Sequence, residues 1–151
     1  MICNPAYICE NGHAVSTTSE RCLDRFCSAC GSAVISECPS CRAVIRGHRK
    51  NECGYYKVPA YCPDCGSAYP WTQTALQTAI DLLIEDDELP AADREKLVAV
   101  LPDVIVETPK SNLAAVRLRK AIKTCTGMVG EALRQLVIDF GCELVKKQLG
   151  L

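Results

Sequence analysis

Tyr61-Cys-Pro-Asp-Cys-Gly66 is one of three Cys-x-x-Cys stretches in this sequence, together with Phe26-Cys-Ser-Ala-Cys-Gly31 and Cys38-Pro-Ser-Cys41. Two intervening residues let both thiolates point at one metal ion, and a following glycine tolerates the positive φ of a tight turn. Zn²⁺ takes four such ligands in a tetrahedron, so three pairs leave one site half complete. We expect Cys9 and His13, within Ile8-Cys-Glu-Asn-Gly-His13, to complete it.

The predicted ligand set holds two Zn²⁺ ions and has eight members: Cys9, His13, Cys27, Cys30, Cys38, Cys41, Cys62 and Cys65. Sequential pairing gives one ion the first four ligands and the other ion the last four, with loops of 13 and 20 residues. Crossed pairing would instead produce a RING-like cross-brace. We favour sequential pairing, because the seven residues between Cys30 and Cys38 are too few for a hairpin that bridges the halves of one site.

The other cysteines and the second histidine stand outside this set. If His13 does not bind metal, Cys53 is the first substitute ligand and Cys22 the second. We expect His48 to be solvated, and we expect structural roles for Cys3, Cys125 and Cys142. A thioredoxin-like redox role would need a βαβ context, which none of the three Cys-x-x-Cys pairs has.

Ten of the twelve cysteines lie within the first 65 residues, and their distribution bears on the compartment. The N-terminal residues Met-Ile-Cys-Asn-Pro-Ala-Tyr lack the basic flank and apolar run of a secretory signal. No stretch approaches the roughly 18 apolar residues that a membrane helix requires. We therefore expect a cytoplasmic protein without a membrane partner, in which reducing conditions keep the thiols free for metal.

The composition changes after residue 70, and it predicts an α+β protein with two domains. Residues 1–70 form a double zinc ribbon in which Ala33–Ile35 and Ala43–Ile45 are brief strands. Residues 71–151 are helical and should form three to four helices. The first expected helix contains Leu76 to Ile84, and the second starts near Pro90. The third follows the cap Thr108-Pro109, and the last runs from Val129 to Leu149. Residues 104–106 are either extended or a last helical turn.

The charges bear on the possible partners and divide the helical part into two halves. The formal net charge is -1, which gives no reason to expect nucleic acid or an anionic membrane as a partner of the whole protein. Residues 71–107 have a net charge of -7, whereas residues 108–151 have +5. We expect these halves to attract each other and to solvate their outer faces. A basic face for an acidic partner is the alternative, built from Lys110, Arg117, Arg119, Lys120 and Lys123.

Several motifs follow one another along the chain in a characteristic order. They are the cysteine stretches, the run Pro59-Ala-Tyr-Cys-Pro-Asp-Cys-Gly66, the junction Tyr69-Pro-Trp-Thr72 and Glu107-Thr-Pro109. Together they resemble the bacterial "domain of unknown function" family 2321 over nearly the whole chain. The resemblance implies a zinc-ribbon, rubredoxin-like β domain followed by a helical C-terminal region, and it implies no activity. Arg42 departs from the pattern, because many such turns have glycine there.

We expect the function to be non-enzymatic: an interaction module with two structural zinc sites and a protein partner. The chain has only two histidines and lacks metalloprotease, phosphate-loop and dinucleotide motifs. The first alternative is nucleic-acid binding, because basic and aromatic side chains alternate in one segment. A RING-like adaptor is the second, and the helical region could also join two copies of the chain. The alternating segment contains Arg42, Arg46, Arg49, Lys50, Tyr55, Tyr56, Lys57 and Tyr61.

Overall fold

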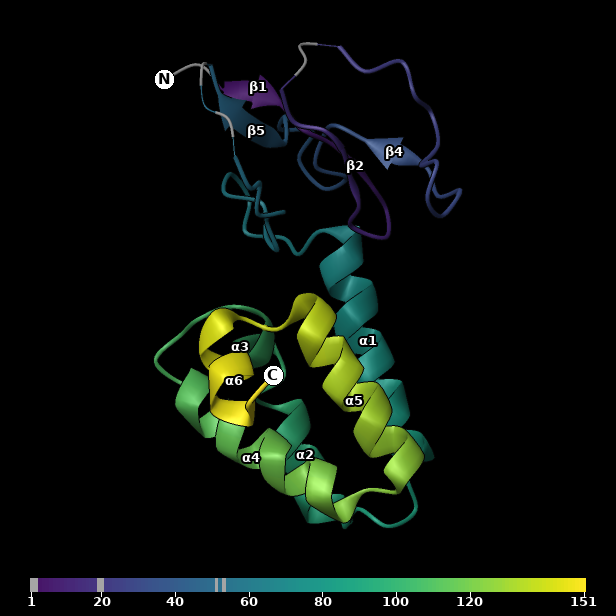
Figure 1. The fold of residues 1–151 in the computed structure, drawn as a ribbon, viewed down its shortest axis with the longest axis vertical. Coiled ribbons are helices and arrows are strands. Elements are labelled where there is room, and N and C mark those ends of the chain that lie inside the picture. Colours follow the sequence, from purple (N-terminus) through teal and green to yellow (C-terminus); the bar gives the residue numbers. More distant parts are fainter. Residues whose placement is uncertain (1–2, 19–20, 51, 53) are drawn as a thin grey trace. The chain divides into compact units, whose positions relative to one another are not determined.

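The computed structural model describes residues 3–18, 21–50, 52 and 54–151 of the chain (Figure 1). The fold class is α+β, as predicted: short antiparallel strands come first and six helices follow. Contacts divide the chain into two compact units, Met1–Gln73 and Thr74–Leu151, and the division falls inside the first helix. We call them the head and the helical unit and describe each by itself.

Two small antiparallel sheets form the head (Figure 1). The first pairs β1 (Cys3–Pro5) with β5 (Arg46–Arg49). The second has the order β3-β2-β4, built from β2 (Tyr7–Cys9), β3 (Ala14–Ser16) and β4 (Val34–Ile35). The expected strand at residues 43–45 does not form, because Val44 makes an isolated bridge to Glu37 that closes a turn, and the strand begins at Arg46 instead.

The head has a small apolar core. Tyr69 and Trp71 stack with ring centroids 4.8 Å apart, and the indole N–H of Trp71 donates to the Pro59 carbonyl at 2.8 Å. Seven buried residues make up this core: Ala6, Ile8, Cys38, Ile45, Cys62, Tyr69 and Trp71. Two of them are predicted metal ligands, so the packing of the head and its predicted metal chemistry share side chains.

Six helices contribute to the rest of the chain, and most of the helical unit packs around α4. Amphipathic spacing of Leu and Val buries one face of each longer helix in a core of 17 residues. The helix α4 contacts α2, α3, α5 and α6. The bounds are α1 (Pro70–Glu85), α2 (Ala91–Val98), α3 (Pro102–Ile105), α4 (Ser111–Thr124), α5 (Gly127–Phe140) and α6 (Glu143–Leu149).

The expectation of three to four helices is wrong, for two local reasons. Residues 102–105 form the short helix α3, and Val106 after them is extended. The expected last helix is two helices, because Gly141 after α5 has an extended backbone, with φ of -66° and ψ of 149°, and the Cys142 N–H donates to the Val104 carbonyl of α3 at 2.8 Å. The helix expected at Pro109 begins at Ser111, whose hydroxyl accepts the Thr108 N–H at 2.8 Å.

A buried carboxylate joins distant parts of the helical unit. One oxygen of Asp86, just after α1, accepts the Leu89 N–H at 2.8 Å. The other accepts the Thr126 N–H at 2.8 Å and the Thr126 hydroxyl at 2.9 Å. Burial alone would raise the pKa of Asp86, but the hydrogen bonds from Thr126, Leu89 and Glu88 outweigh it and hold the pKa below its usual value.

Across the described residues, none of the helices combines the length and the apolar character needed to cross a bilayer.

Candidate metal centres

One eight-residue turn occurs three times in the head, at residues 26–33, 37–44 and 61–68. In each case an isolated antiparallel bridge joins the first residue to the last. The N–H of the first cysteine donates to the carbonyl of the residue five positions later, at 2.8 Å in all three turns. The acceptors are the carbonyls of Ser32, Ala43 and Ser67. The carbonyl of the first cysteine accepts at 2.8 Å from the N–H four residues on. The three Cys-x-x-Cys pairs therefore share one backbone geometry, which the cysteine spacing indicated and the eight-residue repeat could have shown.

The residue after the second cysteine has a left-handed backbone in all three turns. Gly31 and Gly66 both have φ of 74°, which glycine adopts without a steric penalty. Arg42 has φ of 67° at the equivalent position and is the only non-glycine residue with positive φ among those described. The departure of Arg42 from the pattern thus changes the side chain but not the turn.

The fourth ligand pair comes from a different turn, between β2 and β3. The Cys9 N–H donates to the His13 carbonyl at 3.0 Å, and the Gly12 N–H donates to the Cys9 carbonyl at 2.8 Å. Gly12 has φ of 88°, and a Cβ there would lie 3.0 Å from the Trp71 Cβ. Glycine is therefore required at this position for two reasons, the backbone conformation and the close approach of Trp71. The turn brings the side chains of Cys9 and His13 to the same side.

The first candidate metal group combines this turn with residues 27–30. Its four donor atoms, three Sγ and one imidazole nitrogen, lie within 4.8 Å of one another. The His13 Nδ1 is 3.5 Å from the Cys9 Sγ and 3.7 Å from the Cys27 Sγ. The Cys9 and Cys30 Sγ atoms are 3.7 Å apart. These contacts define a group of three cysteines and one histidine.

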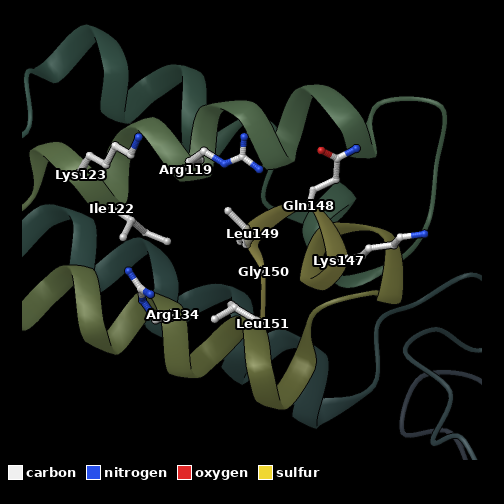
Figure 2. A pocket seen from close by; sticks show the side chains of 9 residues that line it. All are labelled: Arg119, Ile122, Lys123, Arg134, Lys147, Gln148, Leu149, Gly150 and Leu151. Carbon is white, nitrogen blue, oxygen red and sulfur yellow. The ribbon is translucent and has the colours of Figure 1, made fainter.

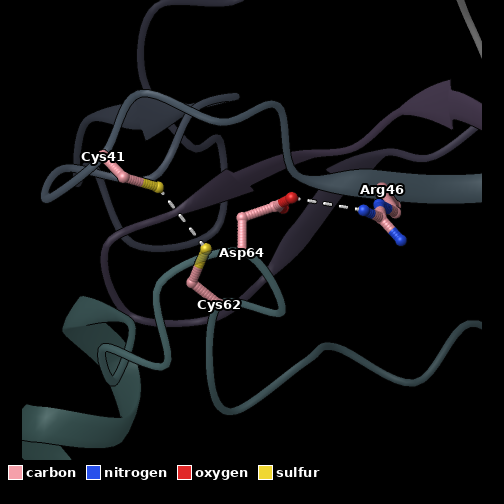
Figure 3. Close-up of polar contacts among 4 residues, drawn as sticks. All are labelled: Cys41, Arg46, Cys62 and Asp64. Atoms are coloured by element: carbon pink, nitrogen blue, oxygen red, sulfur yellow. Dashed lines mark hydrogen bonds and ion pairs between the residues drawn. The ribbon is translucent and has the colours of Figure 1, made fainter.

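The second candidate metal group contains four cysteines, Cys38, Cys41, Cys62 and Cys65, whose Sγ atoms also lie within 4.8 Å of one another. Cys41 and Cys62 point toward each other across the group, with their Sγ atoms 3.7 Å apart (Figure 3). The Cys38 and Cys65 Sγ atoms are 3.8 Å apart. Beside the group, Arg46 reaches Asp64, which stands between the two cysteines of the last pair, at 3.5 Å.

The observed distances fit tetrahedral metal coordination. A tetrahedron with metal–sulfur bonds of about 2.3 Å has S···S edges of about 3.8 Å, and one nitrogen at about 2.0–2.1 Å gives S···N edges of about 3.5–3.6 Å. Three S···S contacts are 3.7, 3.8 and 3.7 Å long, two S···N contacts are 3.5 and 3.7 Å long, and all donor pairs within each group lie within 4.8 Å. A disulfide would bring two sulfurs to about 2.05 Å. Both groups therefore have the dimensions of four-ligand metal sites.

The grouping follows the order of the chain. The first four predicted residues form one group and the last four form the other. Crossed pairing, which a RING-like arrangement requires, does not occur among the described residues. In each group the first ligand of a pair is buried and the second is exposed.

Two serines outside the predicted ligand set lower the pKa of two of the exposed thiols. The backbone and hydroxyl of Ser32 lower the pKa of Cys30 to about 5. The hydroxyl and backbone of Ser67 lower the pKa of Cys65 to about 6. In the remaining turn the Ala43 N–H lowers the pKa of Cys41, but loss of water and the neighbouring thiols raise it to about 12. A serine two residues after the second cysteine is the signal that could have identified these positions.

The cysteines outside the predicted ligand set do not join either group. Cys22 and Cys3 are half-buried, and the buried Cys125 and Cys142 belong to the helical unit. Cys53 lies outside the described residues. The expectation of a solvated His48 is wrong, because its ring is half-buried, with Nδ1 2.8 Å from the Thr17 hydroxyl.

The comparisons with known proteins agree with the sequence resemblance. A family model described as an uncharacterized protein conserved in bacteria, DUF2321, matches residues 3–149. Searches of curated proteins and of solved structures found no match. Because the match covers nearly the whole sequence, the chain belongs to this bacterial family, which is called domain of unknown function 2321.

Proposed function

We propose that the head is a zinc module with two structural Zn²⁺ sites, and that the protein is a non-enzymatic interaction module rather than an enzyme. The observation that carries the zinc proposal is the set of donor distances, which match a tetrahedron with zinc–sulfur and zinc–nitrogen bond lengths. His13 Nδ1 and seven cysteine Sγ atoms would hold the two ions. The ions would supply cross-links between the turns of each group.

Zinc suits both groups better than iron does. Four thiolates in a tetrahedron accept either metal. The first group, however, combines three thiolates with one imidazole, which is a usual donor set of structural zinc sites. Because each group contains at least one copy of the same repeated turn, one metal for both is the simpler assignment. The rubredoxin-like and zinc-ribbon descriptions of the head belong to this proposal.

A structural role follows from the number of ligands. A catalytic zinc site keeps a coordination position open for water or substrate, usually with three protein ligands. Here each group offers four donors. The small apolar core of the head supports the same role, since structural zinc contributes roughly 10–16 kcal/mol of apparent binding energy in small zinc peptides. Thiolate-rich sites also favour a reducing compartment such as the cytoplasm.

A protein partner is favoured by apolar side chains on the metal-site loops. Phe26, directly before Cys27, is 62% exposed, and Val44, which closes the second turn, is 54% exposed. Leu23 on the loop before the first turn is 84% exposed. Loops that are fixed by metal and expose large apolar side chains suit a protein contact. Exposed Leu113 and Val116 on α4 suit a separate contact between helical units of two copies.

Nucleic-acid binding is the weaker candidate. Tyr55 is 94% exposed and free to stack on a base. Tyr56, in contrast, donates its hydroxyl to the Arg46 carbonyl at 2.7 Å and packs on the His48 ring. The basic and aromatic segment thus offers fewer stacking surfaces than its sequence suggests. A mobility shift at low salt that Tyr55→Ala abolishes would favour nucleic acid over a protein partner.

Metal analysis of the purified protein tests the zinc proposal, and the two histidines provide a matched pair. We expect two zinc ions and no iron in the native protein. His13→Ala should lower the zinc count toward one, whereas His48→Ala should leave it at two. Cys30→Ser should behave like His13→Ala, and Cys22→Ser like His48→Ala. Equal counts in all four variants would contradict the ligand assignment.

A pull-down with the zinc-loaded full chain tests the interaction proposal. Phe26→Ser with Val44→Ser should release a protein that the native chain retains, while zinc content stays at two. Met128→Ser, a change of an 85% exposed residue in the helical unit, is the control. Retention that is the same in both variants would contradict a partner at the metal-site loops.

A further inference from the structure

The helical unit contains a hollow of about 510 Å³ among α4, α5 and the end of α6 (Figure 2). This volume lies within the range of about 300–1,000 Å³ that small-molecule sites occupy. All its lining residues belong to the helical unit, so the hollow is separate from the candidate metal groups. An inference about it therefore does not rest on the zinc proposal.

All charged side chains in the lining are cationic. Four cationic side chains contribute to it, and we call them the basic rim: Arg119, Lys123, Arg134 and Lys147. No carboxylate side chain lines the hollow. Side chains of one sign around a common space repel each other, and a bound anion relieves that repulsion.

Helix dipoles explain only part of this rim. Lys123 and Lys147 lie in the last turns of α4 and α6, where a cation is stabilised by the negative end of the helix. Arg119 precedes the last turn of α4, and Arg134 lies in the middle of α5. The two arginines therefore need another explanation, and a guanidinium suits phosphate or carboxylate because of its fork of donors.

These arginines have little competition from protein carboxylates. Across the described residues, Arg119 makes no ion pair within 4.0 Å. Arg134 has one weak partner, with its Nε 3.8 Å from Glu131, whose side chain is 74% exposed. Such an exposed pair is worth little and can be exchanged for a bound anion. In Figure 2, Lys147 points away from the other three cations, so Arg119, Lys123 and Arg134 are the main candidates for contact.

Three apolar side chains also line the hollow, together with Gln148 and Gly150. Ile122 from α4 points toward Leu149 and Leu151, which occupy the middle of the view in Figure 2. We call these three residues the apolar floor. Leu151 remains 39% exposed, and an apolar group seated on the floor would cover it. A rim of cations beside an apolar floor matches a ligand that has both an anionic and an apolar part.

We propose that this hollow binds a small organic dianion, of the phosphate monoester class, with its charged group at the basic rim and its apolar group on the apolar floor. A dianion interacts more strongly with a group of cations than a monovalent ion does. The apolar group adds affinity because it removes the surface of the floor from water.

Phenyl phosphate is a suitable probe, with inorganic phosphate and phenol as its two halves. We expect phenyl phosphate to shift the backbone NMR signals of residues around the hollow in the full-length protein, and to bind more tightly than either half. Binding should weaken as salt rises, because the contact is charged. Inorganic phosphate that binds as tightly as phenyl phosphate would overturn the role of the apolar floor, and no shift with any probe would overturn the site.

Charge-matched variants give the second test. Arg119→Gln with Arg134→Gln should weaken phenyl phosphate binding by about tenfold or more, because hydrogen bonds to charged groups are lost. Lys110→Gln with Lys120→Gln removes the same charge from exposed positions that do not line the hollow. Equal weakening in both double variants would mean that general charge attraction, and not the hollow, binds the probe. Circular dichroism of each variant confirms that the helices remain folded.

Discussion

The head and the helical unit have cores of very different size. Among the described residues, the core of the helical unit contains 17 buried residues, and the core of the head contains seven, of which two are candidate metal ligands. The head also depends on short strands and isolated bridges, whereas the helical unit has complete helices. Apolar burial is sufficient to explain the second unit but not the first. We therefore predict that the head needs metal to fold and that the helical unit does not.

Metal removal should therefore have the largest effect, and only on the head. With a strong zinc chelator at neutral pH, we expect the head to unfold while the helices persist. Trp71 is the single tryptophan of the chain and is buried in the head core, so its fluorescence should shift to the red. Circular dichroism at 222 nm should retain most of its helical signal. A simultaneous loss of both signals would contradict independent stabilisation of the two units.

The helical unit should respond most to loss of its buried carboxylate. Asp86→Ala leaves the buried N–H of Leu89 and the N–H of Thr126 without their acceptor. We expect the free energy of unfolding of the helical unit to fall by about 2–4 kcal/mol, while the zinc count stays the same. Chemical denaturation followed at 222 nm measures the change.

Asp81→Ala is the matched control for this variant, since Asp81 is an exposed aspartate on α1 that contacts only Gln77 through its side chain among the described residues. Its effect should be within about 0.5 kcal/mol. A loss in Asp81→Ala as large as that in Asp86→Ala would show that helix charge, and not the buried hydrogen bonds, is responsible.

Acid should also unfold the two units at different pH values, with a smaller effect on the stability of the helical unit. The pKa of Asp86 is lower in the folded state than its ordinary value of 3.8, so its contribution to stability is present above pH 3.8 and is lost as the pH falls through the folded pKa. The thiolates and imidazole of the head bind metal only when deprotonated, so zinc should leave at a higher pH. In a pH titration, Trp71 fluorescence should change before the 222 nm signal. The reverse order would contradict the assignment.

The sequence predicted the metal groups better than it predicted the helices, and the reason is physical. A Cys-x-x-Cys pair fixes its own local geometry, so its spacing alone was sufficient to expect the turns. The grouping of the pairs depended on one loop argument, the short segment between Cys30 and Cys38, and the structure groups them in the same way.

The helix boundaries depended on contacts that no local pattern contains. The break at Gly141 results from the Val104 carbonyl, which lies far away in the sequence. The start of α4 depends on the Ser111 hydroxyl, which accepts the Thr108 N–H and donates to the Asp103 carbonyl at 2.9 Å. The roles of Ser32 and Ser67 were missed for a different reason, because a serine in a loop is common and its meaning appears only when the three turns are superposed.

The smallest predicted effect compares the three repeated turns with one another. Arg42 holds the left-handed conformation that Gly31 and Gly66 hold without strain, and its side chain gains only an exposed ion pair with Glu37 at 3.6 Å. Arg42→Gly should therefore stabilise the head by about 0.5–1 kcal/mol, measured as resistance of Trp71 fluorescence to a competing chelator.

Gly31→Ala and Gly66→Ala should destabilise the head by about 1 kcal/mol each. No atom lies within 4 Å of a Cβ built at either glycine, so the loss would come from the backbone conformation and not from a clash. Gly127→Ala has equal space, without a positive φ, in the helical unit, and it should leave the head unchanged. If Arg42→Gly weakened the head as much as Gly31→Ala does, the stability of these turns would depend on the side chain after the second cysteine. The cost of the left-handed backbone would then be smaller than the contribution of that side chain.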